Sequence, residues 1–186
     1  MNPFPPPPVI PQRPASLTVF GILNLIFGVM GLVGLVVSLK LYYTPLEGQT
    51  GLMADLLRAE PFYASCMRVM SVPSALYVIA MIVSGIGLLQ ARDGARRLAI
   101  LCGVYGILAG IVNGYLTFYH VMPFTIEYTV ATVKEPAIAG MMRSFTQAGT
   151  ITGMLAAFAY PVVTLIFMGR KSVCDYCRSH AGETPA

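Results

Sequence analysis

Residues 91–97 read Ala91-Arg92-Asp93-Gly94-Ala95-Arg96-Arg97, and this short basic turn separates two long apolar runs. Of the 186 residues, 56% are hydrophobic and only 11% are charged, whereas a soluble domain carries about 25% charged residues. A chain of this length cannot bury so much apolar surface in water, so it needs lipid as its solvent. The net charge of +4 is too small and too scattered to indicate a nucleic-acid partner.

Four apolar runs have about the 20 residues that a helix needs to cross the hydrocarbon core. They cover residues 17–39, 69–89, 98–119 and 148–168. The first run is too long for a signal peptide and no small-x-small cleavage site follows it, so we expect it to be retained. The sequence predicts an all-α membrane protein in which residues 17–169 form a domain of four transmembrane helices.

Polar segments flank the four runs. Residues 1–16 are rich in proline and are expected to form a solvated tail. The stretches 40–68 and 120–147 contain helical spacing of apolar residues, so we expect a short surface helix in each loop, near 52–58 and 124–133. Residues 170–186 are expected to be a polar tail outside the bundle.

The distribution of Lys and Arg predicts the orientation. The side of the basic turn carries Arg13, Arg92, Arg96, Arg97, Arg170, Lys171 and Arg178, close to the ends of the apolar runs. The other side carries Lys40, Arg58, Arg68, Lys134 and Arg143, spread through longer loops and matched by five acids. Because cytoplasmic segments collect positive charge, we expect both termini in the cytoplasm and both polar stretches outside it.

A shift of 75 residues aligns the two halves of the chain. The shared pattern E-P-x2-A-x2-M-R comprises Glu60, Pro61, Met67 and Arg68 in the first half and Glu135, Pro136, Met142 and Arg143 in the second. It predicts two tandem repeats, about 23–95 and 98–170, that are parallel because each holds two spans. We interpret the motif as a helix start with an interfacial arginine rather than as a ligand site.

Small residues recur at helical spacing within the runs. Such residues let helices approach closely, and the candidates for helix packing are Gly28, Gly31, Gly103, Gly106, Gly110, Gly114, Gly149 and Gly153. Packing within one bundle and formation of a homodimer both remain open.

The interiors of the four runs contain no Asp, Glu, Lys, Arg or His. Proton relays and ion pathways use such groups, so the sequence offers no catalytic residue. Asn24 is the most polar side chain of the first run, and we expect it to point into the bundle and find a hydrogen-bond partner.

One constellation has the spacing of a metal or redox site: Cys174 and Cys177, with His180 following. The two thiolates and the imidazole could bind zinc, or the cysteines could exchange disulfides. The third alternative is an ordinary tail without special chemistry. Zinc is the one cofactor that the sequence suggests.

The stretch RPASLTVFGILNLIFG, from Arg13 to Gly28, resembles the opening of small, uncharacterised four-span proteins of bacterial membranes. The resemblance covers the first span and otherwise only the layout. It implies an inner-membrane location, and it does not indicate any particular activity.

The sequence leaves three functions open. The first is a non-enzymatic integral membrane protein that acts through helix–helix or protein–protein contacts in assembly, scaffolding or envelope maintenance. Its partners would be the lipid bilayer and a second copy or another membrane protein. The alternatives are a cytoplasm-facing thiol or zinc sensor and a carrier of small apolar molecules. The carrier predicts a groove between the two halves.

Overall fold

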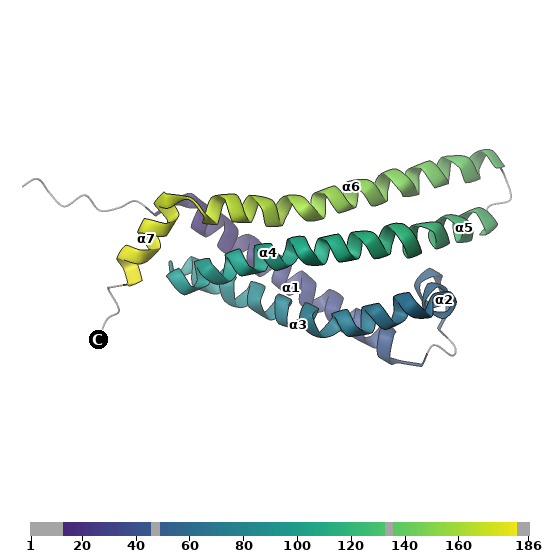
Figure 1. Cartoon of the computed structure of the whole chain (residues 1–186), viewed down its shortest axis with the longest axis horizontal. Coiled ribbons are helices and arrows are strands. Elements are labelled where there is room, and N and C mark those ends of the chain that lie inside the picture. Colours follow the sequence, from purple (N-terminus) through teal and green to yellow (C-terminus); the bar gives the residue numbers. More distant parts are fainter. Residues whose placement is uncertain (1–12, 46–48, 133–135, 182–186) are drawn as a thin grey trace, which may run out of the picture.

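The computed structural model describes residues 13–45, 49–132 and 136–181, and every regular element in these ranges is a helix (Figure 1). In chain order these are α1 (Ala15–Tyr43), α2 (Leu52–Ala59), α3 (Pro61–Leu89), α4 (Asp93–Leu116), the π-helix η1 (Thr117–Val121), α5 (Met122–Thr132), α6 (Pro136–Met168) and α7 (Lys171–Ala181). Most of the predicted proline-rich tail, and Glu135 of the repeat motif, lie outside the described residues.

Four helices are long and apolar enough to cross a membrane: Ala15–Tyr43, Pro61–Leu89, Asp93–Ala131 and Gly140–Met168. The prediction of an all-α, multi-pass membrane protein with four spans is thereby confirmed. Most large apolar side chains of these helices are exposed, among them Met30, Val69 and Leu155, which are at least 64% exposed. Lipid is the solvent that suits such a surface.

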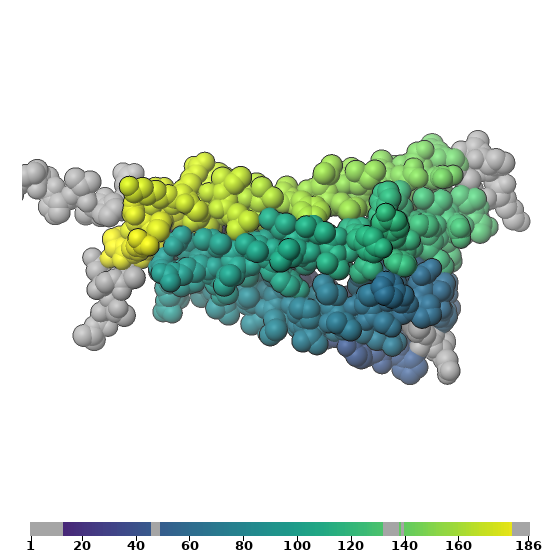
Figure 2. All heavy atoms as spheres, in the orientation of Figure 1, coloured from purple at the N-terminus to yellow at the C-terminus, as the bar shows by residue number. Residues whose placement is uncertain are grey.

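The spans form two antiparallel pairs. α1 packs along α3, α4 packs along α6, and α3 packs against α4 to join the pairs. Figure 1 shows α7, the α3–α4 turn and the start of α1 at one end of the bundle, here called the α7 end. α2 and α5 lie at the opposite end, the α2 end. In the space-filling view of Figure 2, α3, α4 and α6 build the front surface and α1 lies largely behind them.

The stretch after the third span differs from the prediction. A separate surface helix near 124–133 was expected, but α4, η1 and α5 run into one another without a break from Asp93 to Thr132. Pro123 lacks the amide hydrogen that a helix residue donates to the carbonyl one turn earlier. The wider π turn at Thr117–Val121 ends two residues before Pro123, and the helix continues through this proline.

The apolar runs 69–89 and 148–168 are parts of longer helices, which begin at the repeat motif as its interpretation predicted. α3 starts at Pro61 and α6 at Pro136, each at the proline of the repeat motif. Proline is well suited to the first turn of a helix because its missing N–H is not needed there. Pro73 lies in the middle of α3. The first polar stretch does contain a short helix, α2.

The C-terminal segment is not a tail outside the bundle. Residues 171–181 form α7, which packs on α4 and α6. Val173 and Cys177 of α7 join Leu17, Leu88 and Met168 in an apolar cluster at the α7 end. The expectation failed because α7 is polar on average, while its few apolar side chains share one face.

The two halves do not pack in the same register. Gly28 of α1 faces Ile82 of α3. Under the 75-residue shift the equivalent pair is Gly103 and Ala157, but the atoms nearest to Gly103 belong to Leu165 and Pro161, one to two turns further along α6. The predicted duplication therefore stays a sequence-based prediction, and any repeat has diverged in its packing.

Three arginines satisfy carbonyl groups at the C-terminal ends of three spans. Arg68 Nε donates to Tyr42 O of α1 at 3.1 Å, and Arg13 Nη2 donates to Leu89 O of α3 at 2.7 Å. Arg96 Nη1 donates to Met168 O of α6 at 3.3 Å. The last four carbonyls of a helix have no partner inside it, and its C-terminal end is negative, so a cation is favourable there.

Candidate ligand-binding cavity

A buried polar contact holds three spans together near the α7 end of the bundle. Asn24 of α1 is 1% exposed and donates from Nδ2 to Ser84 Oγ of α3 at 3.0 Å. The hydroxyl of Tyr160 on α6 donates to Asn24 Oδ1. The expectation that Asn24 points inward and finds a partner is thus confirmed. Because each partner comes from a different helix, the contact fixes α1, α3 and α6 relative to one another.

Beyond this contact α1 separates from α6. Near the α7 end the Phe20 and Phe167 rings lie 5.5 Å apart, and one to two turns later Phe27 meets Tyr160 at 4.7 Å. From there α1 crosses obliquely behind the other spans towards the far side of α3 (Figure 1). A cavity of about 450 Å³ opens where α1 has left α6.

The cavity lies between the α1–α3 pair and the α4–α6 pair, and its volume falls in the range of small-molecule sites. Its wall is mostly apolar. The lining residues are Phe27 and Gly31 of α1; Met70, Ser74, Tyr77, Val78 and Met81 of α3; Tyr105, Gly106, Ala109, Gly110, Asn113 and Gly114 of α4; Thr117 of η1; and Met154, Ala156, Ala157, Phe158, Tyr160 and Pro161 of α6.

Glycines set the width of this cavity on the α4 side. A Cβ added at Gly110 would lie 3.0 Å from Phe158 of α6, and one at Gly114 would lie 2.7 Å from Met154 Cε. At Gly106 it would lie 3.0 Å from Pro161 and 3.3 Å from the Tyr77 hydroxyl. Larger residues at these positions would clash with α6 or fill the cavity.

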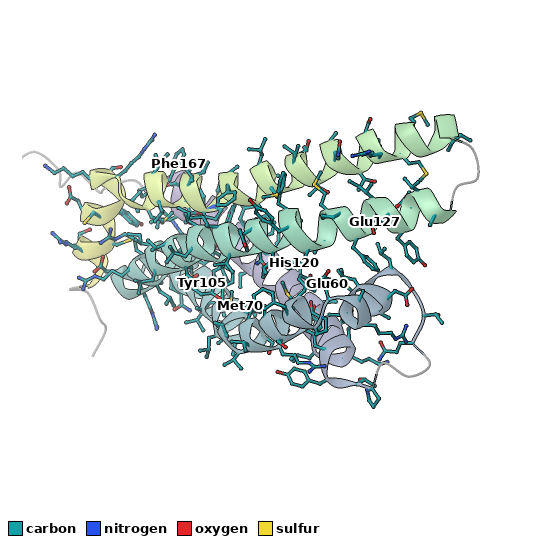
Figure 3. All side chains as sticks on the ribbon, turned by 45° about the vertical axis from the view of Figure 1, so that its right-hand side comes forward. Glu60, Met70, Tyr105, His120, Glu127 and Phe167 are labelled. Carbon is teal, nitrogen blue, oxygen red and sulfur yellow. The ribbon has the colours of Figure 1, made fainter. Side chains whose placement is uncertain are left out.

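One polar group of the wall lacks a partner. The hydroxyl oxygen of Tyr105 is buried and has no hydrogen-bond partner among the described residues. Its ring packs on Tyr77, with ring centroids 5.0 Å apart, and Figure 3 labels it on α4, with Met70 on α3. A buried hydroxyl without a partner costs free energy, which a bound molecule with a polar group would recover.

The π turn links the cavity to the α2 end. Thr117 of η1 lines the cavity, and His120 of the same turn lies 3.1 Å, Nδ1 to Oε2, from Glu60 at the start of α3. The His120 ring also lies beside Phe62, at 5.5 Å between centroids. The contact therefore joins the two helix pairs at the end opposite to Asn24.

The predicted packing glycines divide into two groups. Six have close neighbours on another helix, as predicted: Gly28, Gly31, Gly103, Gly106, Gly110 and Gly114. A Cβ at Gly149 or Gly153 would meet nothing within 4 Å, so these two do not pack within the bundle. The difference arises because both lie on the part of α6 that is exposed on most sides.

The repeat-motif residues serve different purposes in the two halves. Glu60 contacts His120, Arg68 binds the end of α1, and Met67 packs beside a cluster formed by Leu56, Tyr63 and Leu116. In the second half Met142 and Arg143 are exposed. Arg143 lines a separate cavity between α5 and α6.

The cysteine pair lies on α7. Cys177 is 0% exposed in the apolar cluster, and Cys174 is partly exposed one turn earlier. Burial raises the pKa of the Cys177 thiol, an effect that the nearby Arg96 charge opposes only in part. A raised pKa disfavours the thiolate that both metal binding and disulfide exchange require. The His180 side chain lies outside the described residues, and the described ones contain no cluster of three His, Cys, Asp or Glu side chains that could bind a metal.

The sequence did not identify the cavity residues Tyr77, Tyr105 and Met70. A signal was present, since tyrosines in the middle of an apolar span need a partner for each hydroxyl.

Comparisons of the chain with protein-family models, curated proteins and solved structures find no match. The geometry of the cavity therefore carries the functional argument.

Proposed function

We propose that the protein binds a lipid-soluble molecule of the membrane in the cavity between its two helix pairs. The carrier alternative predicted a groove between the two halves of the chain. The observation that supports it is the cavity of about 450 Å³ at that place, whose mostly apolar wall contains the unpartnered Tyr105 hydroxyl.

The wall defines the chemistry of the molecule. Phe27, Met70 and Phe158 offer apolar surface, so most of the ligand is hydrocarbon. The Asn113 amide and the Tyr105 hydroxyl lie about 12 Å apart along α4, so each can exchange a hydrogen bond with a different polar group. The wall contains no Asp, Glu, His, Lys, Arg or Cys, the side chains that most often transfer protons near neutral pH, and we propose a non-enzymatic binder or carrier.

Thermal unfolding tests this function. The protein is stripped of lipid in detergent, and a membrane lipid extract is then added back. A molecule that binds only the folded state raises Tm. We expect a rise for the wild type and none for Ala157→Phe, whose ring would occupy the cavity.

Leu155→Phe is the matched control, because Leu155 lies on the same helix, is 68% exposed and does not line the cavity. It should respond like the wild type. Equal rises in all three proteins would show that lipid stabilises the outer surface only, and the proposal would be lost.

The second candidate function is contact with another protein within the membrane. Gly149 and Gly153 of α6 leave open space where a partner helix could approach closely. The partner would be a second copy or another membrane protein. Chemical cross-linking in membranes with a cysteine at position 153 tests this contact, and a product of dimer mass is the expected result.

We further propose that the protein resides in the inner (plasma) membrane with both termini in the cytoplasm. The excess of Arg and Lys at the α7 end supports this orientation. Two of these arginines, Arg13 and Arg96, also bind helix ends, so part of that charge has a structural use.

A further inference from the structure

A second cavity lies beside the first along α6, nearer the α2 end. It has a volume of about 440 Å³, opens to the surface and is lined by η1, α5 and α6. Its wall combines apolar residues, such as Phe118 and Met122, with Glu127, Arg143 and Gln147. We call it the outer cavity, and the larger one the inner cavity.

The outer cavity lies at the depth of lipid headgroups. A helix crosses the hydrocarbon core in about 20 residues. Counted from Leu98, which follows the basic turn, the third span leaves the core near Phe118. Counted back from Met168, α6 leaves it near residue 148, so Gln147 and Arg143 lie just beyond the core.

The two cavities follow one another along α6. Gln147 lines the outer cavity and Met154 the inner one, a separation of about 10 Å at 1.5 Å per residue. On the facing helix, Phe118 of the outer cavity directly follows Thr117 of the inner one. One extended amphiphile can therefore lie along both, with one of its chains in the inner cavity.

The charged side chains of the outer cavity remain available to a ligand. Arg143 and Glu127 face the same cavity from α6 and α5, yet no ion pair joins these two described residues. Both are exposed, and Figure 3 labels Glu127 on α5, beyond His120. The pair presents one cation and one anion to whatever fills the cavity.

We infer that the ligand is a zwitterionic phospholipid with a phosphate and a primary ammonium group. Arg143 binds the phosphate, Glu127 binds the ammonium, and Gln147 donates a further hydrogen bond. An anionic lipid without the ammonium would meet the uncompensated Glu127 carboxylate. The inference rests on the proposed function, since it names the membrane lipid that enters the inner cavity.

Native mass spectrometry of the full chain tests the inference. The delipidated protein is offered an equimolar mixture of phosphatidylethanolamine, phosphatidylglycerol and diacylglycerol with identical chains. We expect the wild type to retain phosphatidylethanolamine about tenfold more than diacylglycerol, the effect of one charge-assisted contact. Arg143→Gln should lose this preference and Arg143→Lys should keep most of it.

The Glu127→Gln variant tests the headgroup preference more specifically than the Arg143 variants. Without the carboxylate, Arg143 alone selects the headgroup, and the preference should move towards phosphatidylglycerol. An unchanged preference in either Arg143→Gln or Glu127→Gln would overturn the inference. Equal retention of all three lipids by the wild type would also overturn the inference, but it would be consistent with the proposed function. Retention of none of the lipids would contradict both the inference and the proposed function.

A soluble headgroup separates the lipid from a free phosphate compound. Glycerophosphoethanolamine carries the same charges without acyl chains. We expect it not to displace the bound phospholipid at equal concentration. Displacement would show a site for a soluble phosphate ester and would contradict the assignment to a membrane lipid.

Discussion

At the residue scale, two tyrosine hydroxyls illustrate opposite uses of the same group. Tyr160 donates to the buried Asn24 and helps to fix three helices. Tyr105 lines the inner cavity, and its buried hydroxyl has no hydrogen-bond partner among the described residues. The first hydroxyl stabilises the folded protein, and the second costs stability because it is buried without a partner.

Tyr105→Phe and Tyr160→Phe should therefore have opposite effects. In lipid-free detergent, we expect Tyr105→Phe to raise the free energy of unfolding by about 1 kcal/mol, because it removes a buried, unsatisfied hydroxyl. Tyr160→Phe should lower it by about 0.5–1.5 kcal/mol, because Asn24 Oδ1 loses its donor. Denaturant titration measures both, and a loss of stability in both variants would refute the partnerless state of Tyr105.

The sequence predicted the inward position of Asn24 because one amide in an apolar span has to find a partner. It did not predict that Ser84 and Tyr160 would be the partners, since both lie far from Asn24 in the chain. It also placed Cys177 in a polar tail, although the spacing of Val173 and Cys177 on α7 is that of one buried face.

At the scale of the helices, the contacts of α4 with α6 depend on glycine. Gly110→Leu would force its side chain against Phe158, which lies 3.0 Å from the added Cβ. We expect a loss of about 1–3 kcal/mol in the free energy of unfolding from this overpacking. Steric trapping or thermal unfolding in detergent measures the change.

Gly153→Leu is the control for helix propensity and added apolar surface. Gly153 is also a span glycine, but it has open space around its Cβ position. Its replacement should leave stability near that of the wild type. If Gly110→Leu unfolds at the same temperature as Gly153→Leu, the α4–α6 contact is looser than described.

Helix positions were predictable from the sequence, and the motif prolines indicated where α3 and α6 start, but hydropathy alone did not give the helix ends. The hydrocarbon core selects apolar runs of about 20 residues, which is why four spans were found. It sets no limit on how far a helix continues beyond the core. α6 has 33 residues and begins at Pro136, well before its apolar run. The π turn before Pro123 likewise follows from backbone geometry that hydropathy does not reveal.

At the scale of the whole molecule, the basic α7 end predicts which side faces the cytoplasm. In a protein whose native cysteines are replaced by serine, Thr50→Cys should react with a membrane-impermeant maleimide in intact cells. Gly94→Cys should react only after permeabilisation. Both positions are exposed, so access to the reagent depends on the side of the membrane. Labelling of Gly94→Cys in intact cells would reverse the orientation.

The cavities could not be predicted from the sequence because they depend on how complete helices cross. The inner cavity exists because α1 leaves α6 after Phe27 and Tyr160 meet, and because α4 and α6 pack in a register unlike that of α1 and α3. Both features arise from contacts between residues distant in the chain. Local patterns such as periodicity and motif spacing do not record them.

If the inner cavity holds a lipid-soluble molecule, the protein should retain it on gentle extraction from its own membrane. Mass measurement of the extracted protein, with no lipid added, tests this. We predict that the wild type and Leu155→Phe each carry about one bound amphiphile per chain and that Ala157→Phe carries none. Equal amounts of bound lipid on all three proteins, or none on the wild type, would contradict the claim.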